Sequence, residues 1–103
     1  MWIQMIKARL KTGTEEQFAA FEEQIRAIEQ PGSGWIRSTA ARAQKDPDTV
    51  YIIVAFESEA AARARESDPR RQEGLVKVRE LIGEIFDGPP EFIDLDVISE
   101  HTP

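Results

Sequence analysis

Cysteine is absent from this 103-residue sequence, and histidine occurs once, as His101. Without cysteine the chain can form no disulfide, no thiolate nucleophile and no sulfur-ligated metal site. A serine–histidine–aspartate triad would depend on His101, in a C-terminal tail of the kind that is seldom held in place. A metal site would need carboxylates alone, and Asp94 and Asp96, next to Glu91, are better explained as solvated residues of an edge strand. We therefore expect no metal, and the lack of cysteine favours a cytoplasmic location.

Long apolar runs are also missing, since none approaches the roughly 20 residues that span a bilayer. The first seven residues lack the leading positive charge and the long apolar block of a signal peptide. Lysine and arginine total 13 against 19 acidic residues, and the net charge of −6 would repel a polyanion. The six glycines are scattered in turns and form no phosphate-binding loop. We expect neither a membrane nor a nucleic acid as partner.

The arginines cluster in one part of the sequence, at Arg63, Arg65, Arg70 and Arg71. Charge runs usually mark a solvated helix face, and this is our interpretation. The alternative is an entrance that attracts an acidic ligand.

Hydrophobic periodicity predicts four strands and two helices. Alternation or unbroken apolar character predicts strands at residues 2–10, 35–44, 50–56 and 91–99, with a turn at 45–49. A capping box, Thr14 to Gln17, predicts the start of the first helix, whose apolar stripe contains Phe18, Phe21, Ile25 and Ile28. Ser58 and Glu59 open the second helix, which is interrupted before Pro69 and restarts with the stripe Leu75, Val78, Ile82 and Ile85.

The order strand–helix–strand–strand–helix–strand predicts one α+β domain over residues 1–103, with a ferredoxin-like four-stranded antiparallel sheet. Both helices would cover one face of that sheet. Residues 50–56 are nevertheless apolar on both faces, and Ile3 and Met5 add apolar area opposite Ile6 and Leu10. Because one wet face normally produces clean alternation, something must cover the second face. A second copy of the chain is the simplest candidate, so we expect a homodimer joined through its sheet faces.

The run from Tyr51 to Ser58, which leads straight into an alanine-rich helix, and the later Ser67-Asp68-Pro69 complete a known pattern. Together with the element order they resemble the antibiotic-biosynthesis-monooxygenase-like family of the dimeric α/β-barrel superfamily. The resemblance covers nearly the whole chain. It implies a dimeric α/β barrel with a ligand pocket between helices and sheet in each subunit. Members of the family include cofactor-free monooxygenases that oxidise aromatic polyketides to quinones, haem-degrading enzymes, and proteins without known activity.

The haem-degrading branch of that family relies on an asparagine, a tryptophan and a histidine. In this sequence Ala8, Ala64 and Gly74 stand at those positions, no asparagine occurs anywhere, and the only histidine is His101. Haem degradation of that kind is therefore not expected.

Cofactor-free oxygenation requires a pocket that favours the phenolate form of its substrate through hydrogen-bond donors or positive charge. Five residues are candidates for contact with such a substrate: Gln4, Trp35, Arg37, Tyr51 and Arg79. Each also has a structural explanation. Gln4 can lie at a wet strand end, Trp35 can be a core aromatic, and the Tyr51 hydroxyl can lie at the sheet rim. The two arginines can be ordinary surface charges.

We expect a dimeric, cofactor-independent monooxygenase acting on a small hydrophobic or aromatic compound. The alternative is a ligand-binding or stress-associated dimer without catalysis, which the absence of an obvious acid–base pair favours. An isomerase or decarboxylase on the same scaffold is a third interpretation, because this fold supports many functions.

Overall fold

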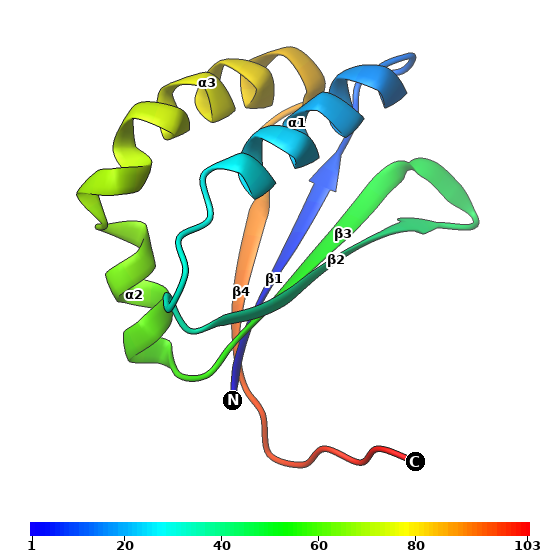
Figure 1. The fold of residues 1–103 in the computed structure, drawn as a ribbon. Helices are drawn as coiled ribbons and strands as arrows, with labels where there is room; N and C mark the ends of the chain where they lie inside the picture. Colours follow the sequence, from blue (N-terminus) through cyan, green and yellow to red (C-terminus); the bar gives the residue numbers. More distant parts are fainter.

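The computed structural model describes all residues from 1 to 103, which form four strands and three helices. In chain order they are β1 (Trp2–Arg9), α1 (Glu15–Ala27), β2 (Trp35–Ala43), β3 (Asp46–Phe56), α2 (Glu59–Glu66), α3 (Pro69–Ile85) and β4 (Glu91–Asp96). The strands pair antiparallel in the order β2–β3–β1–β4. All three helices lie on one side of this sheet (Figure 1). The predicted α+β fold is confirmed, with the second helix divided into α2 and α3.

The central pair β1 and β3 determines which side chains face the helices. Ile6 is opposite Ile52 and Ala8 is opposite Val50, so these residues share one face. Ala8 and Val50 are buried, as expected for the side that α1 and α3 cover. The alternation predicted for residues 2–10 therefore gives the correct orientation of the first strand.

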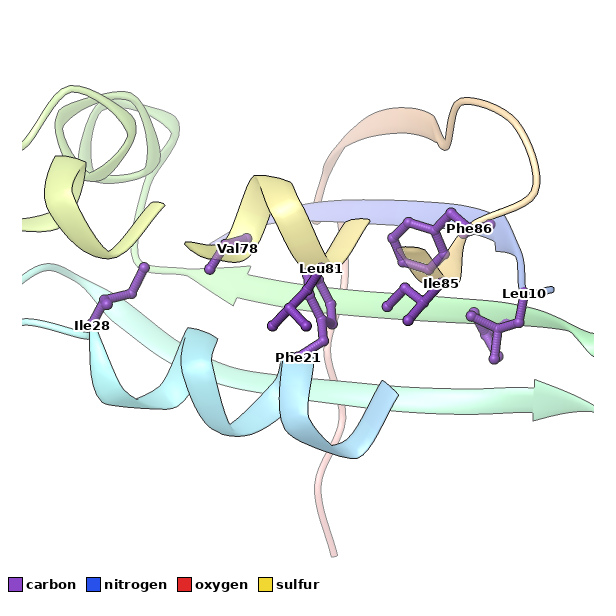
Figure 2. Packing of buried hydrophobic residues seen from close by; sticks show 9 residues of the cluster. Leu10, Phe21, Ile28, Val78, Leu81, Ile85 and Phe86 are labelled. Atoms are coloured by element: carbon purple, nitrogen blue, oxygen red, sulfur yellow. The ribbon is translucent and has the colours of Figure 1, made fainter. Parts of the chain in front are cut away.

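The main core lies between α1, α3 and the sheet. Figure 2 shows Phe21 of α1 beside Leu81 of α3, with Ile85 further along the same helix. The rings of Phe21 and Phe86 meet edge to face, with centroids 5.7 Å apart. Each fully buried aliphatic or aromatic side chain stabilises the fold by roughly 1.5–3 kcal/mol. Two apolar helix stripes, predicted from three- and four-residue spacing, thus form one core.

Gly74 explains how closely α1 and α3 approach. A Cβ atom at this position would collide with the Cγ2 atom of Ile28, which is buried in the core. The expectation that all six glycines lie in turns is wrong for Gly74 and Gly83, which lie inside α3. A glycine inside a helix is unfavourable by about 1 kcal/mol relative to alanine. The close contact with Ile28 gives this glycine a structural reason, and leaves no room there for a larger side chain.

The opposite face of the sheet is apolar at its centre and carries no helix. Ile3 and Met5 of β1 lie between Ala55 and Ile53 of β3 on one side and residues of β4 on the other. Leu95 of β4, next to Ile3, is 40% exposed. We call this surface the outer sheet face.

Three local predictions at the chain's turns and ends are wrong. The Thr14 hydroxyl does not cap α1 but donates to the carbonyl oxygen of Lys11 at 2.6 Å. The hairpin turn is shorter than residues 45–49, because β3 already begins at Asp46. The last strand ends at Asp96 rather than at residue 99.

The caps of the other two helices agree with the sequence. Ser58 Oγ accepts from the backbone N–H of Ala61 at 3.1 Å, and Asp68 Oδ1 accepts from that of Arg70 at 2.9 Å. Pro69 occupies the first turn of α3, where no backbone donor is needed. The interruption predicted before Pro69 is therefore the junction between α2 and α3.

Candidate functional site

A cavity of about 360 Å³ lies between α1 and the sheet. Its apolar wall comes from both layers: Ile6, Ile52 and Val54 from the sheet, and Phe21 and Ile25 from α1. Trp35 and Ile36, at the start of β2, also line it and are 37% and 42% exposed. Because these two residues are partly exposed, a ligand can enter the cavity beside them. The volume and the apolar walls suit a small hydrophobic compound.

Three of the five predicted contact residues line this cavity, namely Gln4, Trp35 and Arg37. Tyr51 does not, because it lies opposite Lys7 of β1 and thus on the outer sheet face. Arg79 is exposed on α3 and does not line the cavity. The structure therefore brings together the residues of β1 and β2, and leaves the other two elsewhere.

The polar groups of Gln4 and Trp35 are already engaged within the protein. Gln4 Nε2 donates to Asp94 Oδ1 at 3.2 Å, and the Trp35 indole N–H donates to Ser38 Oγ at 2.9 Å. Arg37 lies opposite Ala55 of β3, which belongs to the other face of the sheet, and pairs with Glu100 at 3.8 Å while its side chain is 56% exposed, so it lies at the border of the cavity. A ligand would therefore contact mainly those side-chain atoms of Gln4 and Trp35 that do not form these hydrogen bonds.

Asp94 joins β4 to α2 through Arg63. Arg63 Nη2 donates to Asp94 Oδ2 at 2.9 Å, and its guanidinium lies 5.1 Å from the centre of the Trp2 ring. The hydrogen bond from Gln4, and next that from Arg63, hold the pKa of Asp94 below its usual value. This carboxylate is therefore an ion-pair partner on the helix-facing side of the sheet. No group of three or more histidine, cysteine, aspartate or glutamate side chains is arranged to hold a metal ion.

The most buried polar groups of the cavity were not among the predicted site residues. Arg65 donates through Nε to Glu29 Oε2 at 3.1 Å and through Nη2 to Glu29 Oε1. Their side chains are only 12% and 10% exposed, and both line the cavity. Burial, and then the nearby positive charge of Arg71, lower the pKa of Arg65 to about 10, so it stays protonated at neutral pH. The guanidinium also lies 5.3 Å from the centre of the Phe56 ring.

Arg71 is more deeply buried than Arg65, with 4% of its surface exposed. Its Nη1 donates to the backbone carbonyl of Arg65 at 3.1 Å, while its buried Nε has no hydrogen-bond partner. Burial lowers the pKa of Arg71. The interpretation of the arginine cluster as a solvated face is wrong for these two residues, because the junction before Pro69 turns them inward. Their clustering in the sequence was the only available signal.

The model of the antibiotic biosynthesis monooxygenase family matches residues 1–75, nearly three quarters of the chain. The chain belongs to this family. No curated protein matches it. The family assignment agrees with the resemblance based on element order and the Tyr51–Ser58 run.

Several solved structures share this fold. A protein from Bordetella bronchiseptica assigned to these monooxygenases is 23% identical, with a TM-score of 0.71 and coverage of 95% of this chain and 98% of its own. A variant of SnoaB, a cofactor-independent oxygenase from Streptomyces nogalater, is 14% identical, with a TM-score of 0.72 and coverage of 96% and 94%. A Nitrosomonas europaea protein of unknown function is 18% identical, with a TM-score of 0.72 and coverage of 99% and 93%. At these identities the similarity establishes the fold.

No helix of the structure is both long enough and apolar enough to cross a membrane.

Proposed function

We propose that this chain is a cofactor-free monooxygenase that oxidises a small aromatic compound in the cytoplasm. The observation that carries the proposal is the cavity of about 360 Å³ between α1 and the sheet, with apolar walls from both layers. Membership of the antibiotic biosynthesis monooxygenase family supports it, and so does the fold shared with a cofactor-independent oxygenase.

The proposed reaction needs no added reductant. A phenol with a free para carbon loses its proton, the electron-rich anion reacts with O₂ at that carbon, and the resulting hydroperoxide loses water to give a quinone. One phenol and one O₂ thus yield one quinone and one water. The protein must bind the ring in a dry space and stabilise the anion. The apolar wall of Ile6, Ile52 and Val54 supplies the first requirement, and the arginines that line the cavity supply the second.

Oxygen uptake with a panel of dihydroxynaphthalenes, in the presence of a metal chelator and without any reductant, tests this function. We expect the protein to consume one O₂ for each quinone formed. Val54 lines the cavity and is buried, so Val54→Phe should fill part of the cavity and lower the turnover by about tenfold or more. Val76→Phe is the matched control, because Val76 is 54% exposed on α3. No uptake with any compound, or equal turnover of both variants, would contradict the proposal.

We also propose that the protein is a homodimer joined through the outer sheet face. Met5 lies at its centre, between Ile53 of β3 and Ile93 of β4, and no helix of the same chain covers it. A two-fold pair of such faces would bury the apolar side chains of both copies. Burying a lysine at this position would leave an unpaired charge in the interface.

Sedimentation velocity at micromolar concentration tests the dimer. We expect the unmodified protein to sediment as a dimer and Met5→Lys as a monomer. Val76→Lys introduces the same charge on an exposed part of α3 and should leave the dimer intact. A monomeric unmodified protein would rule out this association.

Haem degradation remains outside the proposal. Ala8 is buried in the core, and Gly74 packs against Ile28, so neither position offers a side chain that could act on haem. His101 lies exposed in the C-terminal tail and does not line the cavity.

A further inference from the structure

Arginines outnumber carboxylates among the charged residues that line the cavity. Among its charged lining residues are four arginines and two glutamates: Arg26, Arg37, Arg65, Arg71, Glu22 and Glu29. Arg26 and Arg37 are paired with Glu23 and Glu100, which do not line the cavity, and Arg65 is paired with Glu29, so Arg71 is the lining arginine without an ion pair. Apolar walls with a low effective dielectric strengthen the field of such charges. An anionic ligand would therefore be attracted to Arg71 in this cavity, in a chain whose net charge is −6.

Arg71 is a buried cation with no carboxylate in ion-pair contact, although Asp68 and Glu66 are near enough for their charges to act on it. Three carboxylates near it are engaged by other arginines: Asp68 by Arg70 at 2.7 Å, Glu66 by Arg63 at 3.1 Å, and Glu29 by Arg65. Glu22, which also lines the cavity, is not in ion-pair contact with Arg71. Arg71 itself forms no ion pair, although only 4% of its surface is exposed. A buried charge normally has a partner of opposite sign. The missing partner indicates that a ligand supplies it.

The hydrogen bonds of Arg71 indicate how such a ligand would bind. One terminal nitrogen, Nη1, is committed to the Arg65 carbonyl, and the buried Nε is unpartnered. The Nε–Nη2 edge of a guanidinium can donate two parallel hydrogen bonds to a carboxylate, which has two acceptor oxygens. A phenolate has a single oxygen and matches this edge less well. A carboxylate is thus the group that best satisfies Arg71.

We infer that the ligand of this cavity is an aromatic acid, and that its carboxylate is the counter-ion of the Arg71 guanidinium. The ring then lies along Ile6, Ile52 and Val54. Arg65, held by Glu29, adds a second positive charge nearby. The inference rests on the proposed function, because it names the class of substrate for the same cavity.

Calorimetric titration with naphthoate and with naphthamide tests the inference, since the two compounds differ chiefly in charge. The unmodified protein should bind naphthoate at least about tenfold more tightly than naphthamide. Arg71→Met should remove this preference while leaving the affinity for naphthamide unchanged, which also reports an intact cavity. Arg79→Met is the matched control, because Arg79 is exposed on the same helix and should keep the preference.

Arg71→Lys provides a second variant in case the methionine variant does not fold. Lysine keeps the positive charge but cannot donate two parallel hydrogen bonds as a guanidinium can. The preference for naphthoate should therefore fall without disappearing. Equal affinity of the unmodified protein for the two compounds would overturn the inference. So would tighter binding of naphthol than of naphthoate, or binding of neither acid nor amide.

The oxygen-uptake assay separates failure of this inference from failure of the proposed function. If the protein preferred naphthoate but consumed no oxygen with any phenol, the aromatic-acid site would be supported and the oxygenase function would be contradicted. Oxygen uptake together with equal binding of acid and amide would support the oxygenase and contradict the aromatic-acid site.

Discussion

Replacing Ile85 by alanine is expected to lower the free energy of unfolding by about 2–5 kcal/mol. Ile85 is the largest side chain in the chain that is fully buried, at 0% exposure. It lies in the main core with Phe21, Leu81 and Phe86 (Figure 2). The loss combines the transfer free energy of the removed methyl and methylene groups with the cavity that rigid neighbours leave behind. Urea unfolding followed by circular dichroism measures the change as a lower midpoint at an unchanged slope.

Val76→Ala is the control for this prediction, because Val76 lies on the same helix but is 54% exposed. Truncating an exposed side chain changes stability by no more than about 0.5 kcal/mol. If Ile85→Ala remained within that range, the packing of α3 against α1 and the sheet would have to be different from that described.

The fold could be predicted because side-chain periodicity and the covered face agree in most elements. Ile6 and Ala8 alternate with wetter residues on β1, and Phe21 and Ile85 fall on helix stripes that meet in the core. Burial acts on many residues of each element together, so a single exception does not change the outcome.

Caps and turns could not be predicted as well, because single hydrogen bonds decide them. The Thr14 hydroxyl can accept from the start of α1 or donate to the carbonyl of Lys11, and the structure has the second arrangement. Alternatives of this kind differ by about 1 kcal/mol, less than a local sequence pattern can resolve.

Only part of the cavity could be predicted, for two different reasons. Residues 50–56 are apolar on both faces, so the pattern could not tell that Tyr51 lies away from the helices while Ile52 and Val54 line the cavity. Arg65 and Arg71 belong to a charge run, and their burial depends on how α2 and α3 turn at their junction. That turn depends on tertiary packing, so the spacing of residues along a helix does not predict it.

The pair of Glu29 and Arg65 is expected to be the most sensitive ionic contact of the protein. Replacing Glu29 by glutamine should lower the free energy of unfolding by about 3 kcal/mol, because Arg65 would remain buried beside Arg71 without a carboxylate. Glutamine keeps the shape of the side chain and removes only its charge. Urea unfolding at neutral pH measures the loss, and the same variant should bind naphthoate more tightly, since the cavity gains one positive charge.

Glu23→Gln is the matched control, because Glu23 lies on α1 and pairs with Arg26 while both side chains are about 70% exposed. Such a surface pair contributes only about 0–1 kcal/mol, so its loss should be small. Combining Glu29→Gln with Arg65→Met should recover part of the stability, because the methionine removes the unpaired charge and keeps much of the apolar volume. Equal effects of Glu29→Gln and Glu23→Gln would mean that Arg65 reaches water, and the aromatic-acid site next to it would then lose its dry surroundings.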